Sequence, residues 1–251
     1  MITIAVKPLT ETFLVAIRLG TVLLFSPIEA IRLLPIHTRL LLVLMLSMLI
    51  VGHLPSAPPP TDEIALVLGA FAELCNGLIL SLSIYAAFAV FQIAGQLIDT
   101  QMGLNSLAIL NPSDHSHEPL SGRLLVMLAV LFFFALDGHH QLLQAFVLSF
   151  KLIAPGQCAL FNGFMPIVQQ CSFMFSFALI LASPIIISLM IIDVSGAVLT
   201  RNMPQISTYF LTLPIKFMLG LLVFSLLLND INPMMKKGFQ VCFRTLMQVM
   251  S

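Results

Sequence analysis

Long apolar segments alternate with short polar ones along the chain, and this pattern predicts a set of membrane helices. The long apolar segments are residues 12–34, 64–98, 167–200 and 206–228. A helix rises 1.5 Å per residue and needs about 20 apolar residues to cross the hydrocarbon layer. Residues 64–98 contain no proline and exceed one upright crossing. We expect that helix to be tilted, to bend near Gly77 or to extend beyond the bilayer.

The remaining apolar runs are too short to cross alone. Residues 39–54 follow a break at Pro35 and are short for a full crossing. Residues 123–136 and 141–153 flank the turn-forming tetrapeptide DGHH at positions 137–140. That arrangement predicts a re-entrant hairpin or one bent helix rather than two spans.

Prolines and polar residues mark the expected breaks in the second half of the chain. Pro184 predicts a kink within residues 167–200, and Pro204 lies in the turn that folds the next helix back. Residues 229–251 are expected to form a separate, short amphipathic tail.

Composition makes the membrane prediction firm. The 251 residues are 59% hydrophobic and 9% charged, whereas soluble domains carry about 25% charged residues. The net charge is zero and no basic arm is present, so nothing points to nucleic acid. We predict an all-α membrane protein of helical hairpins with broken and re-entrant helices, forming one membrane-embedded domain over residues 1–251.

The segment from Gln92 to Arg123 departs from the rest because it places Gly, Gln, Asp, Asn and Pro on an apolar framework. Membrane proteins tolerate polar, non-helical backbone at depth only where it is buried in protein or lines a water-filled cavity. The segment therefore indicates a pore, a gate or a transport site.

Charged residues inside the apolar runs are the next candidates for function. Asp193 lies 11 residues before Pro204 and Lys216 lies 12 after it, so an antiparallel hairpin places both at one level, roughly 17 Å from the turn. Charges at such depth usually pair or face a cavity, and we predict that these two pair. The pair either fixes the register of the hairpin or takes part in transport. Arg18 and Glu73 are each free to pair with the other or with another subunit.

Catalytic and metal-binding patterns are weak. The histidines at positions 115, 117, 139 and 140 occur as HxH and HH, which do not share one helix face as two histidines four residues apart would. The sequence has no nucleotide loop and no nucleophile–histidine–acid order, so we expect no metal, no cofactor and no enzyme activity. Two alternatives stay open: a small-solute secondary transporter, which predicts duplicated halves that the chain lacks, and an intramembrane hydrolase using Asp137 and the histidines.

Two stretches of the chain resemble a known family. AGQLIDTQMGLNSLAILNP (Ala94 to Pro112) and ALDGHHQLLQAF (Ala135 to Phe146) resemble the FliR family of the flagellar type III export apparatus, whose virulence counterparts are the SctT proteins. The matching motifs are Gly95, Gln101-Met102-Gly103, Asn111-Pro112 and Asp137-Gly138-His139. The Gln-Met-Gly and Gly-His motifs look flagellar, whereas Leu97-Ile98-Asp99 looks closer to the virulence branch. The flagellar branch is favoured.

The resemblance implies a pore-forming subunit of an export gate that passes unfolded substrates across the bacterial inner membrane at the flagellar basal body. Its implied partners are FliP-like and FliQ-like subunits, which form a helical, cone-shaped pore assembly with it, and an FlhB-like switch protein.

The plug loop of the family maps onto the unusual segment. The implied plug residues are Met102, Gly103, Leu104, Asn105, Ser106, Leu107, Ala108, Ile109, Leu110, Asn111 and Pro112. Their aliphatic side chains suit closure of a narrow pore by exclusion of water, as in other hydrophobic constrictions. The alternative for these residues is simple packing of a helix end on its neighbour.

Overall fold

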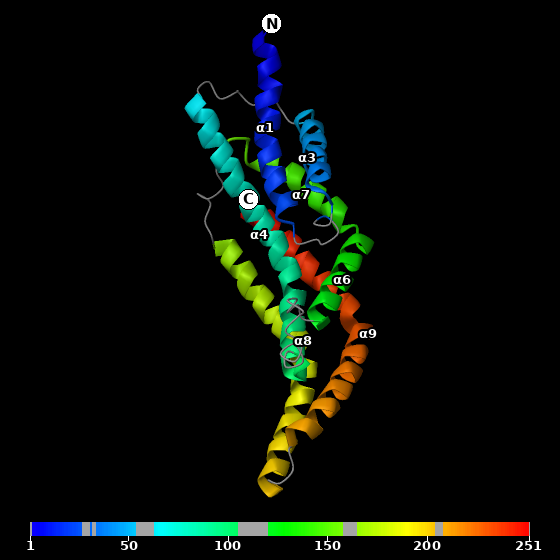
Figure 1. Cartoon of the computed structure of the whole chain (residues 1–251). Coiled ribbons are helices and arrows are strands. Elements are labelled where there is room, and N and C mark those ends of the chain that lie inside the picture. Colours follow the sequence, from blue (N-terminus) through cyan, green and yellow to red (C-terminus); the bar gives the residue numbers. More distant parts are fainter. Residues whose placement is uncertain are drawn as a thin grey trace. The chain divides into compact units, whose positions relative to one another are not determined.

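The described part of the chain folds into helices (Figure 1). The computed structural model describes residues 2–26, 31, 34–53, 63–104, 120–157, 165–203 and 208–250. The helices of these ranges are α1 (Ile2–Leu24), α3 (Ile36–Val51), α4 (Glu63–Met102), α6 (Leu120–Ala135), α7 (Gly138–Leu152), α8 (Met165–Asn202) and α9 (Thr208–Met250). None of the described ranges contains a strand. The predicted all-α class is confirmed.

Three described helices are long and apolar enough to cross a membrane: Ile64–Met102, Val168–Asn202 and Phe210–Asn229. Helices α6 and α7 pass the same test only as a pair, bent by 73° at their junction. The bend follows from Asp137, which has a left-handed backbone with φ 56° and ψ 29°. Aspartate tolerates this conformation better than most residues. The prediction of a re-entrant hairpin or one bent helix, rather than two spans, is therefore confirmed.

The described residues divide into two compact units. Unit 1 contains residues 1–87, 137–171 and 240–251, and unit 2 contains residues 88–136 and 172–239. Helices α4, α8 and α9 each contribute to both units, while α1, α3 and α7 belong to unit 1 and α6 to unit 2. That residues 1–251 act as a single domain stays a prediction.

Two predicted boundaries are wrong. The first helix was expected over residues 12–34, but α1 covers Ile2–Leu24. It ends before the Ser26-Pro27 dipeptide, because helical backbone is disfavoured at the residue preceding a proline. The separate tail expected over residues 229–251 belongs to α9, which continues through Pro233 to Met250. Ile231, Met235 and Phe239 recur every four residues and are buried, so this stretch packs as one face of a helix.

Helix α8 runs through Pro184 without ending. Proline has no N–H, so the carbonyl of Ile180, four residues earlier, loses its usual partner. The hydroxyl of Ser183 donates to that carbonyl at 2.8 Å. A neighbouring hydroxyl thus replaces the missing backbone bond, as polar side chains do in membrane helices that contain proline.

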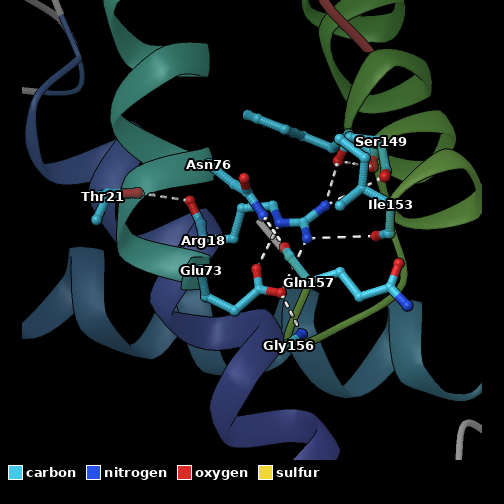
Figure 2. Close-up of polar contacts among 9 residues, drawn as sticks. Arg18, Thr21, Glu73, Asn76, Ser149, Ile153, Gly156 and Gln157 are labelled. Atoms are coloured by element: carbon cyan, nitrogen blue, oxygen red, sulfur yellow. Dashed lines mark hydrogen bonds and ion pairs between the residues drawn. The ribbon is translucent and has the colours of Figure 1, made fainter. Parts of the chain in front are cut away.

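Unit 1 is held together by a buried ion pair between α1 and α4 (Figure 2). Arg18 donates through Nε to Glu73 Oε2 at 2.5 Å and through Nη2 to Glu73 Oε1 at 2.9 Å. Both side chains have no exposed surface. This two-pronged geometry matches the planar guanidinium to the carboxylate. The two residues, whose partners the sequence left open, therefore pair with each other.

The same pair also binds the end of α7 and the turn that follows it (Figure 2). Arg18 Nη1 donates to the carbonyl and hydroxyl oxygens of Ser149, both at 3.2 Å, and Nη2 donates to the carbonyl of Ile153 at 3.3 Å. Glu73 Oε1 accepts the N–H of Gly156 at 2.7 Å. All three guanidinium nitrogens thus have acceptors, and a positive charge lies at the C-terminal end of α7, where the helix dipole favours it.

Small residues let α4 approach its neighbours closely in each unit. A Cβ added to Gly77 would meet the hydroxyl of Thr21 and lie 2.8 Å from the carbonyl of Arg18, so only glycine fits against α1 in unit 1. In unit 2, a Cβ added to Gly95 would overlap the backbone of Gly122 in α6. Such contacts between small residues are typical of helices packed in membranes.

The core of unit 2 contains a cluster of phenylalanines from α4, α6 and α9. The ring centroids of Phe88, Phe133 and Phe239 lie 5.5–5.8 Å apart in pairs. All three side chains are buried. Tilted and edge-on contacts at these distances are favourable and fix the three helices against one another.

The Arg18 network generates a prediction about stability. Replacement of Arg18 or Glu73 alone by Met leaves one charge buried without its counter-charge, which costs about 3–5 kcal/mol. We expect each single variant to fall sharply in cellular level and in the thermal unfolding temperature of the purified protein. The Arg18→Met/Glu73→Met double variant removes both charges and should be milder than either single one.

Arg201→Met supplies the matched control, because Arg201 is exposed near the end of α8. It should leave both readouts near the wild-type values. Equal damage from the double variant and from the single variants would contradict the account of the buried pair.

Candidate functional site at the end of helix α4

The first residues of the predicted plug lie at the C-terminal end of α4 in unit 2. Met102 is the last residue of the helix and is 1% exposed. Gly103 has φ 80° and donates its N–H to the carbonyl of Thr100 at 3.2 Å, which ends the helix with a left-handed residue. Leu104 is half-buried. The other plug residues, Asn105 to Pro112, lie outside the described residues.

Met102 packs directly on the backbone of α9 at Gly220. A Cβ added to Gly220 would lie 2.5 Å from Met102 Cε and 3.0 Å from its Cγ. The missing side chain of Gly220 therefore makes the space that the methionine fills. Methionine is flexible and polarizable, so it fills such an irregular gap well. This contact attaches the last residue of α4 to α9.

Asp193 of α8 and Lys216 of α9 form an ion pair beside this contact. Their side chains are 44% and 18% exposed, respectively. Lys216 precedes Gly220 by four residues and lies on the same face of α9. The side-chain amide of Gln101 donates to Asp193 Oδ2 at 3.5 Å. The ion pair thus joins α8 to α9, and Gln101 brings the end of α4 to it.

The start of α6 is also bound to α4. The carboxylate of Asp99 accepts the N–H of Ser121 at 3.0 Å through Oδ2 and at 3.3 Å through Oδ1. Ser121 lies in the first turn of α6, where N–H groups have no partner within the helix. The buried carboxylate of Asp99 therefore caps α6 and stabilises the positive end of its dipole. It does so from 22 positions earlier in the chain.

These contacts hold both ends of the connection between α4 and α6. The α4 end is attached through Gln101 and Met102 to the α8–α9 pair, and the α6 end is attached through Asp99 to α4 itself. The polar groups described here, one ion pair, one amide and one capping carboxylate, position helix ends. Within the described ranges no three His, Cys, Asp or Glu side chains form a group that could hold a metal ion.

Sequence reasoning missed several residues of this site. Gln101 and Asp99 were noted only as parts of the family motifs, and Gly220 was not singled out. A small residue one turn from an intramembrane lysine is a signal for close helix packing, and Gly220 fits it. Nothing in the sequence indicates that the helix that packs there is α4, because the two are more than a hundred residues apart.

The fold and the site together define an all-α membrane protein whose buried polar groups join helices to one another. The chain belongs to the bacterial export proteins, family 1, whose model matches residues 9–241. It is 28% identical over 227 residues to the flagellar biosynthetic protein FliR of Escherichia coli (strain K12), covering 90% of this chain and 87% of that protein.

Two further relatives match over similar lengths. The chain is 26% identical to the FliR protein of Bacillus subtilis (strain 168), with 95% of this chain and 93% of the relative covered. It is 28% identical to the FliR protein of Aquifex aeolicus (strain VF5), with 95% of each chain covered. The resemblance to the FliR family is confirmed.

The ion pair in this site generates a prediction that tests whether Asp193 and Lys216 act as a pair or independently of each other. Asp193→Lys and Lys216→Asp each place two like charges together, and we expect each single variant to lose protein export. Because both side chains keep some exposure, the loss of stability should lie between that for an exposed pair, about 1 kcal/mol, and that for a buried pair, about 3–5 kcal/mol. The double exchange restores opposite charges and should recover much of the export.

Export is measured as secreted protein in the culture medium, with the level of the variant in the membrane fraction as a second readout. Lys236→Asp makes the same change at an exposed lysine of α9 and should be tolerated. A double exchange as defective as the single variants would rule out a role that depends on pairing.

Proposed function

We propose that this chain is a subunit of the flagellar type III export gate. In this proposal it forms part of the pore through which unfolded substrates cross the bacterial inner membrane at the flagellar basal body. Its partners there are FliP-like and FliQ-like subunits and an FlhB-like switch protein. The match of the family model to residues 9–241 carries the proposal, since it covers nearly the whole chain.

The relatives favour the flagellar branch over the virulence branch, because the three described above are flagellar FliR proteins. The helices are consistent with a place in a membrane, since three of them are long and apolar enough to cross it. A small-solute transporter remains the alternative from another class, and the experiments below separate it from the export gate.

The residues from Met102 to Pro112 are the proposed plug. Its aliphatic side chains close the pore by excluding water. The geometry at its first residues supports this role, because a plug needs a fixed base to return to one closed position. The packing of Met102 on Gly220 and the hydrogen bond from Gln101 to Asp193 supply such a base. In this proposal the Asp193–Lys216 pair serves the gate by holding that base rather than by binding substrate.

A deletion of the gene in its own host, complemented by the intact chain, tests the proposed function. We expect the deletion strain to lose flagellar filament protein from the culture medium and to regain it on complementation. A loss of injected effectors alone would instead assign the chain to the virulence branch. If neither class of secreted protein changed in a host without a second copy, the export-gate proposal would fail and the small-solute transporter would lead.

The plug generates its own prediction. Replacement of Leu104, Leu107, Ile109 and Leu110 by Gly or Ser removes the apolar seal and should let small ions leak across the inner membrane of cells with an assembled gate. Leakage is measured as loss of the membrane potential or as influx of a small solute.

Replacement of the same four residues by Val or Met keeps the seal apolar and should keep the membrane tight. Assembly of the gate is verified for both sets by co-purification. A tight membrane in the Gly/Ser variant with a confirmed assembly would contradict the plug role.

A further inference from the structure

Helix α4 carries a polar stripe within unit 2 that the site described above does not use. Gln92, Gln96 and Thr100 are exposed and recur every four residues, so they lie on one face over about 12 Å. Within the part of the chain that the structure describes, the side-chain amides of Gln92 and Gln96 have no hydrogen-bond partner. The hydroxyl of Thr100 donates to the backbone carbonyl of Gln96 at 2.7 Å.

This stripe lies inside a candidate membrane span, Ile64–Met102. Hydrocarbon offers no partner to an amide, and an unpaired amide there costs several kcal/mol. Lipid is therefore an unfavourable neighbour for Gln92 and Gln96. The face requires a neighbour that can donate and accept hydrogen bonds.

The surface of α8 and α9 at the same level of unit 2 is apolar. Gln101, one residue after the stripe, contacts the Asp193–Lys216 pair, which marks the corresponding level on α8 and α9. The side chains on the outer faces around that pair are large and apolar: Ile191 is 63% exposed and Met218 is 70% exposed. An apolar surface of this kind suits lipid and needs no hydrogen-bonding neighbour, unlike the amides of the stripe.

The residues beside the stripe are consistent with a protein neighbour. Ile93 and Leu97 follow Gln92 and Gln96 along the helix and are half-buried. Amides bordered by aliphatic side chains form the kind of face through which membrane helices associate, with the amides bonded across the contact. A face without formal charge selects a partner helix that is itself uncharged at the contact.

We infer that Gln92, Gln96 and Thr100 form a docking face for a membrane helix of another export-gate subunit, one that presents uncharged hydrogen-bonding groups among apolar side chains. The inference rests on the proposed function, because it requires that the chain assembles with other membrane subunits. Beyond the proposed function, the inference specifies the face of α4 that the neighbouring helix covers.

Site-specific photo-crosslinking in the host tests this inference. A photoreactive residue is placed at position 92 or 96, and at positions 191 and 218 as controls on the apolar surface. After illumination the export complex is purified, and the adducts are identified by mass spectrometry. We expect one discrete adduct with another subunit of that complex from positions 92 and 96, and no such adduct from the controls.

Substitution supplies a second readout. Gln92→Leu/Gln96→Leu keeps the size of the face and removes both amides, whereas Met218→Leu makes a matched change on the apolar surface. Each interhelical hydrogen bond contributes about a threefold change in association, so the double variant should retain partner subunits roughly tenfold less well after mild detergent washing. Met218→Leu should retain them as the wild type does.

Several results would overturn the inference. These are an adduct within this chain only, equal adducts from the control positions, or no adduct at 92 and 96 from an intact complex. Another is ready labelling of Gln92→Cys and Gln96→Cys by a membrane-impermeant thiol reagent in the assembled complex, which would place the face against water. Failure of the chain to purify with any other membrane protein would reject the proposed function as well, so the two failures are distinguishable.

Discussion

The ion pair between Arg18 and Glu73 is the interaction on which unit 1 depends. Both charges are fully buried, and such burial is stable only when each donor and acceptor has a partner. The guanidinium satisfies this condition by binding one carboxylate and the last carbonyls of α7, and Glu73 adds the N–H of Gly156. Three helices and a turn are therefore positioned by one requirement, that both of these buried charges have hydrogen-bonding partners.

The same requirement explains the other polar contacts of the chain. Asp99 is buried and supplies the acceptor that the start of α6 needs, while Ser183 replaces the backbone bond that Pro184 removes. Asp193 and Lys216 join α8 to α9. Charged residues are few in this sequence, and the described contacts place several of them where helices meet.

The comparison of sequence with structure shows where pattern reasoning reaches its limit. The bent pair at Asp137 was predictable, because DGHH is a turn sequence between two runs too short to span. The end of α9 was not, since residues 229–251 were expected to form a separate tail, whereas the burial of Ile231, Met235 and Phe239 continues the helix. A proline such as Pro233 does not end a helix where a buried helical face continues past it. Likewise, the sequence placed Asp193 and Lys216 at one level but did not indicate that Gln101 of α4 joins them.

By itself the sequence determined the class of the protein, an all-helical membrane chain, because hydrophobic length and scarcity of charge are properties of composition and spacing. It also determined the family, since the Gln-Met-Gly and Gly-His motifs are contiguous in the chain. Only the tertiary structure decided which helices meet: Arg18 with the end of α7, Met102 with Gly220 and Asp99 with Ser121. The physical reason is that apolar helices are nearly interchangeable in sequence, whereas their contacts depend on where small residues permit close approach and where buried polar groups find partners.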